Sequence, residues 1–245
     1  PAMSSVPTCP ACESAAHDFF TEHEGMTLYR CRDCATIYLH PMPDEAALAA
    51  LYTDAYDGAL SGYFSKVEKK LRRSRARMKR LARRVQGGRF LDVGCNGGFM
   101  VEAAREHGFD AHGIELDPVS VRYAREHYPA NSYFEGRIED YAPDAPFDLI
   151  YSSEVIEHVP EVAGFVAAIA RLLKPGGHLY VTTPDISHWR RPRRLTDWDG
   201  FCPPSHCVYF TPSSLRALLA RHGLETVHTG FAWKPGIKIL SQKAG

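Results

Sequence analysis

The chain has 245 residues, of which 44% are hydrophobic and 24% charged, and its formal net charge at pH 7 is zero. This composition predicts a globular protein with one good core and a small appendage, and it excludes a disordered or fibrous chain. No apolar run approaches about eighteen residues, so no membrane span is expected, and the absence of a basic segment followed by an apolar stretch favours a cytoplasmic location.

The charge is unevenly distributed along the chain. Residues 66–84 contain eleven Lys or Arg and a single acid, Glu68. Four arginines form a second cluster within 190–194. Such asymmetry indicates an anionic partner or substrate, and a solvated helix face is the alternative.

Four of the seven cysteines form two Cys-x-x-Cys pairs, Cys9/Cys12 and Cys31/Cys34, separated by 18 residues. Two such pairs on tight turns make a tetrahedral thiolate site suited to zinc, and short strands are expected at 18–20, 27–30 and 36–39. Two disulfides are the alternative, which a cytosolic chain disfavours. We therefore predict a zinc ribbon over 1–43, with a structural metal because four thiolates leave no open position.

A helical connector or lid is predicted over 44–86. Asp44 is expected to cap a short helix that runs to residue 52. The basic stretch 65–85 carries apolar residues on one stripe, which predicts an amphipathic helix, and the glycines at 87 and 88 end it.

From residue 87 to the C-terminus strands and helices alternate. This pattern predicts an α/β fold, namely a Rossmann-like, seven-stranded sheet with helices on both faces. Strands are expected at 89–93, 111–115, 132–134, 147–152, 178–182, 225–231 and 237–240, and helices at 98–107, 118–127, 162–173 and 212–221.

A glycine-rich turn, Asp92 to Gly98, follows the first of these strands. Small residues there let the backbone approach a ligand at a helix N-terminus. A dinucleotide fingerprint starting at Gly94 would need glycine at Asn96 and Phe99, and a P-loop would need Gly-Lys-Ser/Thr, so neither fits. Glu115, about twenty residues past the loop, ends the next strand and is placed to accept ribose hydroxyls.

Several motifs together resemble the class I S-adenosylmethionine-dependent methyltransferases. These are the Asp92-x-Gly94-x-Asn96-x-Gly98 loop, Glu115, the string Ser152 to Val159 and the string Leu173 to Gly177, in the order and spacing of that family. The resemblance covers roughly 85–240 and is greatest to the branch of ubiquinone-biosynthesis O-methyltransferases. One departure is Asn96, where the family usually has Gly; because Asn tolerates left-handed backbone, we expect the turn to persist.

The resemblance implies S-adenosylmethionine as cofactor and assigns roles along the strand ends. The loop would lie against its methionine part, Glu115 would hold the ribose, and Ser152 would line the floor near the sulfonium. The residues implied to bind the cofactor are Asp92, Gly94, Cys95, Asn96, Gly98, Glu115, Leu116 and Ile138 (covering the adenine), Glu139 (near its amino group) and Ser152.

Candidates for the chemistry follow the strand 147–152. Glu154, Glu157 and His158 are spaced i, i+3 and i+4, so on a helical turn they would share one face. His158 is a candidate general base. Alternatively the three residues bind a divalent metal that activates a substrate hydroxyl. The string also resembles the metal site of magnesium-dependent O-methyltransferases, including small-RNA 2′-O-methyltransferases, which implies His206 as a fourth ligand and Mg²⁺ or Mn²⁺ as the ion, although iron would also fit.

The aromatic and arginine-rich segment 184–210 is expected to cover the substrate site, because it follows the last parallel strand. Aromatic side chains there suit a flat or apolar acceptor, and arginines suit a phosphate or carboxylate. Packing of the tryptophans onto the domain is the alternative. The candidate substrate residues are Trp189, Trp198, His206 and Tyr209.

Three functions are compatible with these features. The first is methyl transfer to a small-molecule acceptor, on oxygen, in a biosynthetic pathway. The second is RNA methylation, with the ribbon and the basic helix 66–84 contacting RNA, which ranks lower because the helix has no interleaved aromatics. The third is a non-enzymatic binding module with a degenerate cofactor domain, which the nearly intact loop disfavours.

Overall fold

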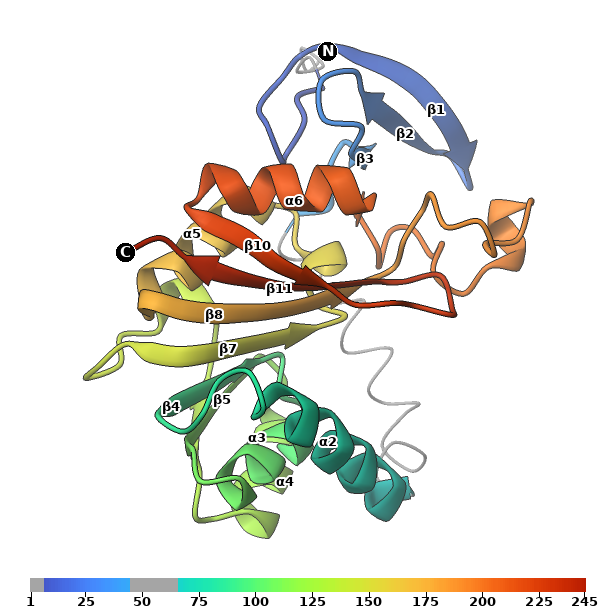
Figure 1. The fold of residues 1–245 in the computed structure, drawn as a ribbon. Coiled ribbons are helices and arrows are strands. Elements are labelled where there is room, and N and C mark those ends of the chain that lie inside the picture. The colour runs from blue at the N-terminus through green and yellow to red at the C-terminus, as the bar shows by residue number, and fades with distance from the viewer. Residues whose placement is uncertain (1–6, 45–65) are drawn as a thin grey trace.

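The computed structural model describes residues 7–44 and 66–245. The helix expected between residues 44 and 52 lies outside the described residues. Two sheets are present, a central one with helices on both faces and a smaller one formed mainly by the N-terminal segment (Figure 1). No helix within the described ranges is both long and apolar enough to cross a membrane.

The central sheet has seven strands, as predicted. Five neighbouring strands run parallel, and the two C-terminal strands add to one edge as an antiparallel hairpin. In sheet order the strands are β10 (Leu224–Thr229), β11 (Ile237–Lys243), β8 (Leu173–Thr183), β7 (Phe147–Ser153), β4 (Arg89–Val93), β5 (Asp110–Glu115) and β6 (Ser132–Glu135).

Strand β8 begins earlier than expected. The prediction placed residue 173 in a helix and left 174–177 between that helix and a strand at 178–182, but Leu173 already pairs with Phe147 of β7. The register shifts between Phe147 and Leu149, and Gly176 adopts a φ of +74°. A bulge therefore absorbs the glycines without ending the strand.

Helices cover both faces of this sheet. Helices α2 (Val67–Leu81) and α3 (Phe99–Glu106) pack together on one face, and α5 (Val162–Leu172) and α6 (Pro212–Arg221) lie on the other (Figure 1). A hydrophobic core lies on each face of the sheet, and successive strand residues point into opposite cores. Phe90 packs with α2 and α3, whereas Leu91 packs in the core on the side of α5 and α6. Helix α4 (Pro118–His127) begins where the Asp117 carboxylate accepts the amides of Val119 and Ser120 at 3.2 and 2.8 Å.

Helix α2 is part of the core of the sheet domain. Met78 is fully buried, Leu81 is 5% exposed, and both join the cluster formed by α3 and β4. Arg75 also makes a two-pronged ion pair with Glu106 of α3, with N···O distances of 2.6 and 2.7 Å. The predicted amphipathic helix is thus present, and its apolar stripe packs into the core beside α3.

The small sheet has four antiparallel strands, one more than predicted. Three come from the N-terminal segment: β1 (His17–His23), β2 (Met26–Cys31) and β3 (Ile37–His40). The fourth, β9 (Val208–Tyr209), comes from the segment between β8 and α6 and pairs with β3. The ribbon sheet therefore includes a strand from the C-terminal half of the chain, which a boundary at residue 43 does not describe.

Candidate cofactor and active site

The glycine-rich loop joins β4 to α3. Gly94, Asn96 and Gly98 all have positive φ, of +77°, +46° and +77°. A Cβ at Gly94 would come within 2.5 Å of Val155, and one at Gly98 within 2.7 Å of the Tyr133 hydroxyl. The loop is thus tight as well as left-handed, and Asn96 keeps the turn as expected.

Glu115 lies across this loop. Its carboxylate accepts the amide of Asn96 at 2.8 Å and those of Leu116 and Asp117 at 2.7 and 3.1 Å. An ionised carboxylate has about four acceptor positions, so capacity for a further hydroxyl donor is left. Burial, at 8% exposure, raises the pKa of Glu115.

The carboxyl group of Asp92 lies near that of Glu115. It is 4% exposed, and burial followed by repulsion from Glu115 raises its pKa to about 8. Arg77 opposes that shift. Two buried carboxyl groups beside the loop favour a ligand that brings hydrogen-bond donors or positive charge.

Two other predicted cofactor residues lie beneath the loop. Cys95 is 4% exposed, and its sulfur packs where a side chain on Gly113 would stand, so its side chain belongs to the core. Ser152, near the end of β7, is fully buried and its hydroxyl has no hydrogen-bond partner in the described structure. An orphaned buried hydroxyl at this strand end fits a polar ligand group nearby.

The predicted adenine end combines an exposed and a buried apolar side chain. Leu116 follows β5 and is 53% exposed, whereas Ile138, in the short helix η2 (Ile138–Asp140), is 3% exposed. Glu139, next to Ile138, lies 3.5 Å from the Arg137 guanidinium. An exposed leucine at a strand end is a surface that a flat ring can cover.

Arg77 of α2 was not singled out in the sequence. Its guanidinium donates to the Tyr151 hydroxyl of β7, lies 5.7 Å from the centre of that ring and is 3.5 Å from Ser153 Oγ. The only signal was its membership of the basic stretch. Its contacts with Tyr151 and Ser153 show that the basic helix also reaches the end of β7, although the arginine itself remains exposed.

Glu157, His158 and His206 converge on one point, with ligand atoms within 4.8 Å of one another. Glu157 and His158 belong to the short helix η3 (Ile156–His158), and His206 comes from the segment before β9. The His158 and His206 rings meet edge to face at 4.5 Å between centroids. Three of the four predicted metal ligands are therefore brought together.

The hydrogen bonds orient all three groups. His158 Nδ1–H donates to the Ser205 carbonyl at 2.7 Å and His206 Nδ1–H to the Gly200 carbonyl at 2.9 Å, so both Nε2 atoms carry the lone pair. Thr183 Oγ1 donates to Glu157 Oε2 at 2.9 Å, whereas Oε1 is buried with no hydrogen-bond partner in the described structure. Carbonyl-anchored imidazoles beside an orphaned carboxylate oxygen are typical of a metal site.

Burial controls the protonation of this cluster. It lowers the pKa of His158 to about 4, lowers that of His206, and raises that of Glu157 to about 8, with repulsion from Glu154 adding to the last shift. The imidazoles are thus neutral at pH 7, as metal ligands must be, whereas Glu157 would have to release its proton when a metal binds. A pKa near 4 makes His158 a weak general base.

Glu154 does not share a helical face with Glu157 and His158. It precedes η3 and has a left-handed φ of +57°, and its carboxylate accepts the Thr182 hydroxyl at 2.8 Å. The i, i+3, i+4 spacing assumed a continuous helical turn from 154, and that expectation was wrong. Glu154 is exposed at the strand ends, with a strained backbone of the kind that clusters at functional sites.

The four candidate substrate residues have different environments. Trp198 and Tyr209 are 9% and 2% exposed and belong to the main core, because Tyr209 lies in β9 and Trp198 folds over Gly200. They present little surface to an acceptor. Trp189 is 74% exposed. His206 belongs to the cluster with Glu157 and His158, which is called the metal-type cluster below.

Trp189 is part of an aromatic platform that the sequence did not indicate. Trp233, from the β10–β11 loop, meets Trp189 edge to face at 6.4 Å, and Phe231 lies 6.3 Å from Trp233. The Arg190 guanidinium stacks on both indoles, at 5.2 and 4.2 Å from their centres. Phe231 and Trp233 are 77% and 60% exposed; the sequence had assigned Phe231 to a strand that in fact ends at Thr229.

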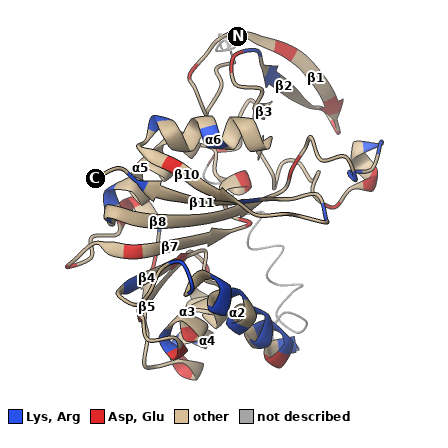
Figure 2. Ribbon diagram, viewed as in Figure 1, with Lys and Arg blue, Asp and Glu red and all other residues tan. Residues whose placement is uncertain are grey.

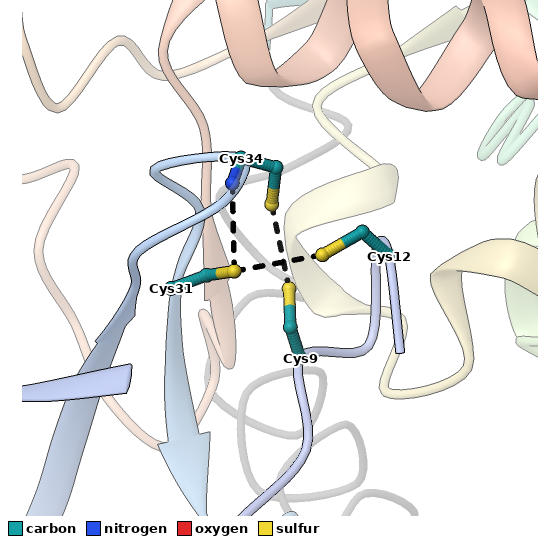
Figure 3. A group of neighbouring side chains, drawn as sticks. All are labelled: Cys9, Cys12, Cys31 and Cys34. Atoms are coloured by element: carbon teal, nitrogen blue, oxygen red, sulfur yellow. Dashed lines mark hydrogen bonds between the residues drawn. The ribbon is translucent and has the colours of Figure 1, made fainter. Parts of the chain in front are cut away.

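The four ribbon cysteines meet as predicted (Figure 3). The Cys9 and Cys34 sulfurs are 3.5 Å apart, as are those of Cys12 and Cys31, and all four lie within 4.8 Å of one another. A tetrahedral zinc ion with Zn–S bonds of about 2.3 Å separates its sulfurs by about 3.8 Å, so this arrangement fits zinc. Zinc would require all four thiols as thiolates, the form that a bound metal stabilises.

The sheet order, the left-handed loop and the acidic strand ends define the class I S-adenosylmethionine-dependent methyltransferase fold. The chain matches the methyltransferase domain family over residues 63–229 and belongs to that family. The resemblance expected from the loop and strand-end motifs is thereby confirmed.

Individual relatives agree with this assignment. A ubiquinone biosynthesis O-methyltransferase of Thiobacillus denitrificans is 41% identical over 181 residues, covering 65% of this chain and 75% of the relative. One of Xylella fastidiosa is 43% identical over 105 residues, 40% of this chain and 43% of the relative, so the chain spans less than half of that protein.

Solved structures share the fold at low identity. The 1,6-didemethyltoxoflavin-N1-methyltransferase of Burkholderia thailandensis, solved with S-adenosylhomocysteine, superposes with a TM-score of 0.62 at 15% identity, over 93% of this chain and all of that one. CalS10, an amino pentose methyltransferase of Micromonospora echinaspora, gives 0.53 at 18% identity, over 78% and 97%.

Proposed function

We propose that this protein transfers a methyl group from S-adenosylmethionine to a hydroxyl of a small acceptor in a biosynthetic pathway. The main observation in support is the left-handed loop Gly94–Gly98, which lies beside buried Asp92 and Glu115 at the carboxyl ends of parallel strands. Membership of the methyltransferase family and the O-methyltransferase relatives support it.

The described residues suit each part of this cofactor. Asp92 would face the ammonium group and Arg77 the carboxylate of its methionine part, while Glu115 would accept the ribose hydroxyls. Leu116 and Ile138 would cover the adenine, with Glu139 near its amino group. The cofactor supplies an activated methyl group; the protein has to align the acceptor and remove its proton.

We propose that Glu157, His158 and His206 bind a divalent cation next to the acceptor. Two imidazoles and one carboxylate favour manganese or iron over magnesium, which prefers oxygen ligands. When bound, such an ion lowers the pKa of a coordinated hydroxyl. Glu154, exposed and held by Thr182, is then the candidate to take up the proton, a role for which the sequence analysis named His158.

The acceptor is proposed to be flat and anionic. Trp189 and Trp233 have exposed aromatic rings, and the Arg190 guanidinium contacts both. The loops that carry these residues lie at the same edge of the sheet as Glu157. Naphthalene-2-carboxylate should quench tryptophan fluorescence more strongly than neutral 2-naphthol. Arg190→Gln should remove that difference and exposed Arg193→Gln should keep it; equal affinity for both probes in the wild type would contradict an anionic acceptor.

For the ribbon we propose a structural zinc ion held by Cys9, Cys12, Cys31 and Cys34. Four thiolates at tetrahedral spacing support it. Because these thiols must stay reduced, we also propose a cytoplasmic location.

Calorimetric titration with S-adenosylhomocysteine tests the central proposal. Wild-type protein should bind it, Glu115→Ala should bind it at least about tenfold more weakly, and Glu126→Ala, an exposed acid on α4, should behave as wild type. Transfer of radiolabel from S-adenosylmethionine to catechol-type acceptors would then establish the reaction. Absence of any binding would sink both this proposal and the RNA alternative.

RNA methylation remains the second candidate because of the charge on α2. Its lysines and arginines are mostly exposed, and in Figure 2 α2 is the helix whose ribbon is coloured most continuously blue, for Lys and Arg. Affinity for RNA that falls steeply with added salt would favour this function.

A further inference from the structure

We infer that the four-cysteine ribbon positions His206 and Glu157, so that the zinc site acts as a remote support of the candidate active site. This inference rests on the proposed function for the meaning of that site, but the physical linkage is independent of it. A ribbon in this role differs from a module that only recruits a partner.

The first link joins the ribbon to β9. Ile37 and Tyr38 of β3 pair with Tyr209 and Val208. The Leu39 amide then donates to the Cys207 carbonyl at 2.9 Å, which extends the ladder toward His206. A two-residue strand has little stability by itself, so β3 must fix its place.

The second link joins β9 to the metal-type cluster. The Cys207 amide donates to the Glu157 carbonyl at 2.9 Å, and the Cys207 side chain is fully buried beside it. His206 directly precedes Cys207. A single residue, Cys207, thus hydrogen-bonds through its N–H to Glu157 and through its carbonyl to the ribbon sheet, and it fixes the backbone next to His206.

A third link runs through aromatic rings. His23 of β1 meets Phe201 edge to face at 5.5 Å, and Phe201 lies 5.3 Å from Tyr209. Phe201 follows Gly200, whose carbonyl accepts the His206 Nδ1–H. The ribbon therefore also positions the group that orients the His206 ring.

Metal binding controls the strand that starts this chain of contacts. Cys31 ends β2, and its amide donates to the Thr36 carbonyl at 2.9 Å, immediately before β3. Cys34 lies in the same turn, with its sulfur 3.2 Å from Thr36 Oγ1. So small a sheet depends on its metal for stability, and loss of zinc would release β3 and then β9.

The cofactor loop is held by different contacts. The amides of Gly94 and Cys95 both donate to the Ile114 carbonyl of β5 at 2.9 Å. Cofactor affinity should therefore survive changes in the ribbon that disturb His206, which separates the two effects.

The test compares Cys34→Ser, Cys34→His and Arg32→Ala in the full chain. Zinc content, S-adenosylhomocysteine affinity, Mn²⁺ affinity and the ¹⁵N spectrum of the His206 ring are measured. Cys34→Ser should lose zinc, the hydrogen-bonded Nδ1–H signal of His206, and Mn²⁺ affinity by about 10- to 100-fold. Cys34→His, which keeps a zinc ligand, should restore all three, and Arg32→Ala, an exposed ribbon change, should leave them intact.

A second variant breaks the linkage without changing a cysteine. Leu39→Pro removes the N–H that donates to the Cys207 carbonyl and leaves all four cysteines in place, so zinc should remain while the His206 signal is lost. This variant decides the case if Cys34→Ser fails to fold. An unchanged His206 signal in zinc-free or Leu39→Pro protein overturns the inference. Failure of wild-type protein to bind S-adenosylhomocysteine overturns the proposed function instead.

Discussion

Thr183 Oγ1 donates a hydrogen bond to Glu157 Oε2 at 2.9 Å and, among the described residues, is the one side-chain donor to this carboxylate, which is only 1% exposed. Thr183 ends β8, so the hydrogen bond ties the last parallel strand to the short helix that carries the candidate metal ligands. It leaves the other oxygen, Oε1, buried without a hydrogen-bond partner in the described structure.

Thr183→Val should weaken Mn²⁺ binding by about tenfold, because a ligating carboxylate that loses its hydrogen-bond donor is less well oriented. Isothermal titration with Mn²⁺ measures this directly. Thr182→Val is the matched control, since Thr182 donates to Glu154, outside the three-ligand cluster. Equal losses in the two variants would argue that Glu154 is a ligand after all.

Gly98→Ala should abolish most of the affinity for S-adenosylhomocysteine. Alanine at φ +77° costs about 1 kcal/mol, and its Cβ would in addition stand 2.7 Å from the Tyr133 hydroxyl and 3.1 Å from Ala124. Gly108→Ala separates the two effects, because Gly108 has a φ of +85° with nothing within 4 Å. Urea unfolding should show a backbone cost in both variants, and calorimetry a loss of ligand only in Gly98→Ala.

The cofactor half of the site could be predicted because its determinants are local. The loop at 92–98 and the acid at 115 follow directly from strand ends, and parallel strands bring those ends to one edge whatever the rest of the chain does. The side chain of Cys95 was the exception, since only the packing against Gly113 shows that it faces the core.

The other half depends on contacts between distant segments. Pairing of β3 with β9 joins segments that lie about 170 residues apart in the sequence. Strand β9 has only two residues, which is too short to show the alternating pattern by which a strand is predicted. It is this pairing that buries Tyr209 and brings His206 to Glu157. The left-handed backbone of Glu154 was equally hidden, because a non-glycine residue gives no sign of positive φ.

The buried carboxyl of Asp92 should make stability depend on pH. Its pKa is about 8 in the folded protein against an ordinary value of 3.8, so the folded state keeps a proton that the unfolded chain releases. Stability from this group is therefore present below about pH 4 and is lost as pH rises to about 8, by at most about 1.4 kcal/mol per pH unit.

Asp92→Asn should flatten this dependence. The difference in unfolding free energy between variant and wild type, measured in urea at pH 5 and pH 8.5, should grow in favour of the variant by at least about 1 kcal/mol. Asp140→Asn, at an exposed position, should track wild type. Parallel curves for Asp92→Asn and wild type would mean that Arg77 already compensates the charge.

Arg77→Gln should weaken S-adenosylhomocysteine binding by about 10- to 100-fold, because a guanidinium that contacts Tyr151 beside Asp92 is placed for a carboxylate. The ligand itself supplies the discriminating control. Methylthioadenosine keeps the nucleoside and lacks the amino-acid group, so its affinity should be the same in wild type and Arg77→Gln. Arg73→Gln, exposed on the same helix, should affect neither ligand. If Arg77→Gln weakens both ligands equally, the arginine supports the fold of the site through Tyr151 and does not recognise the carboxylate.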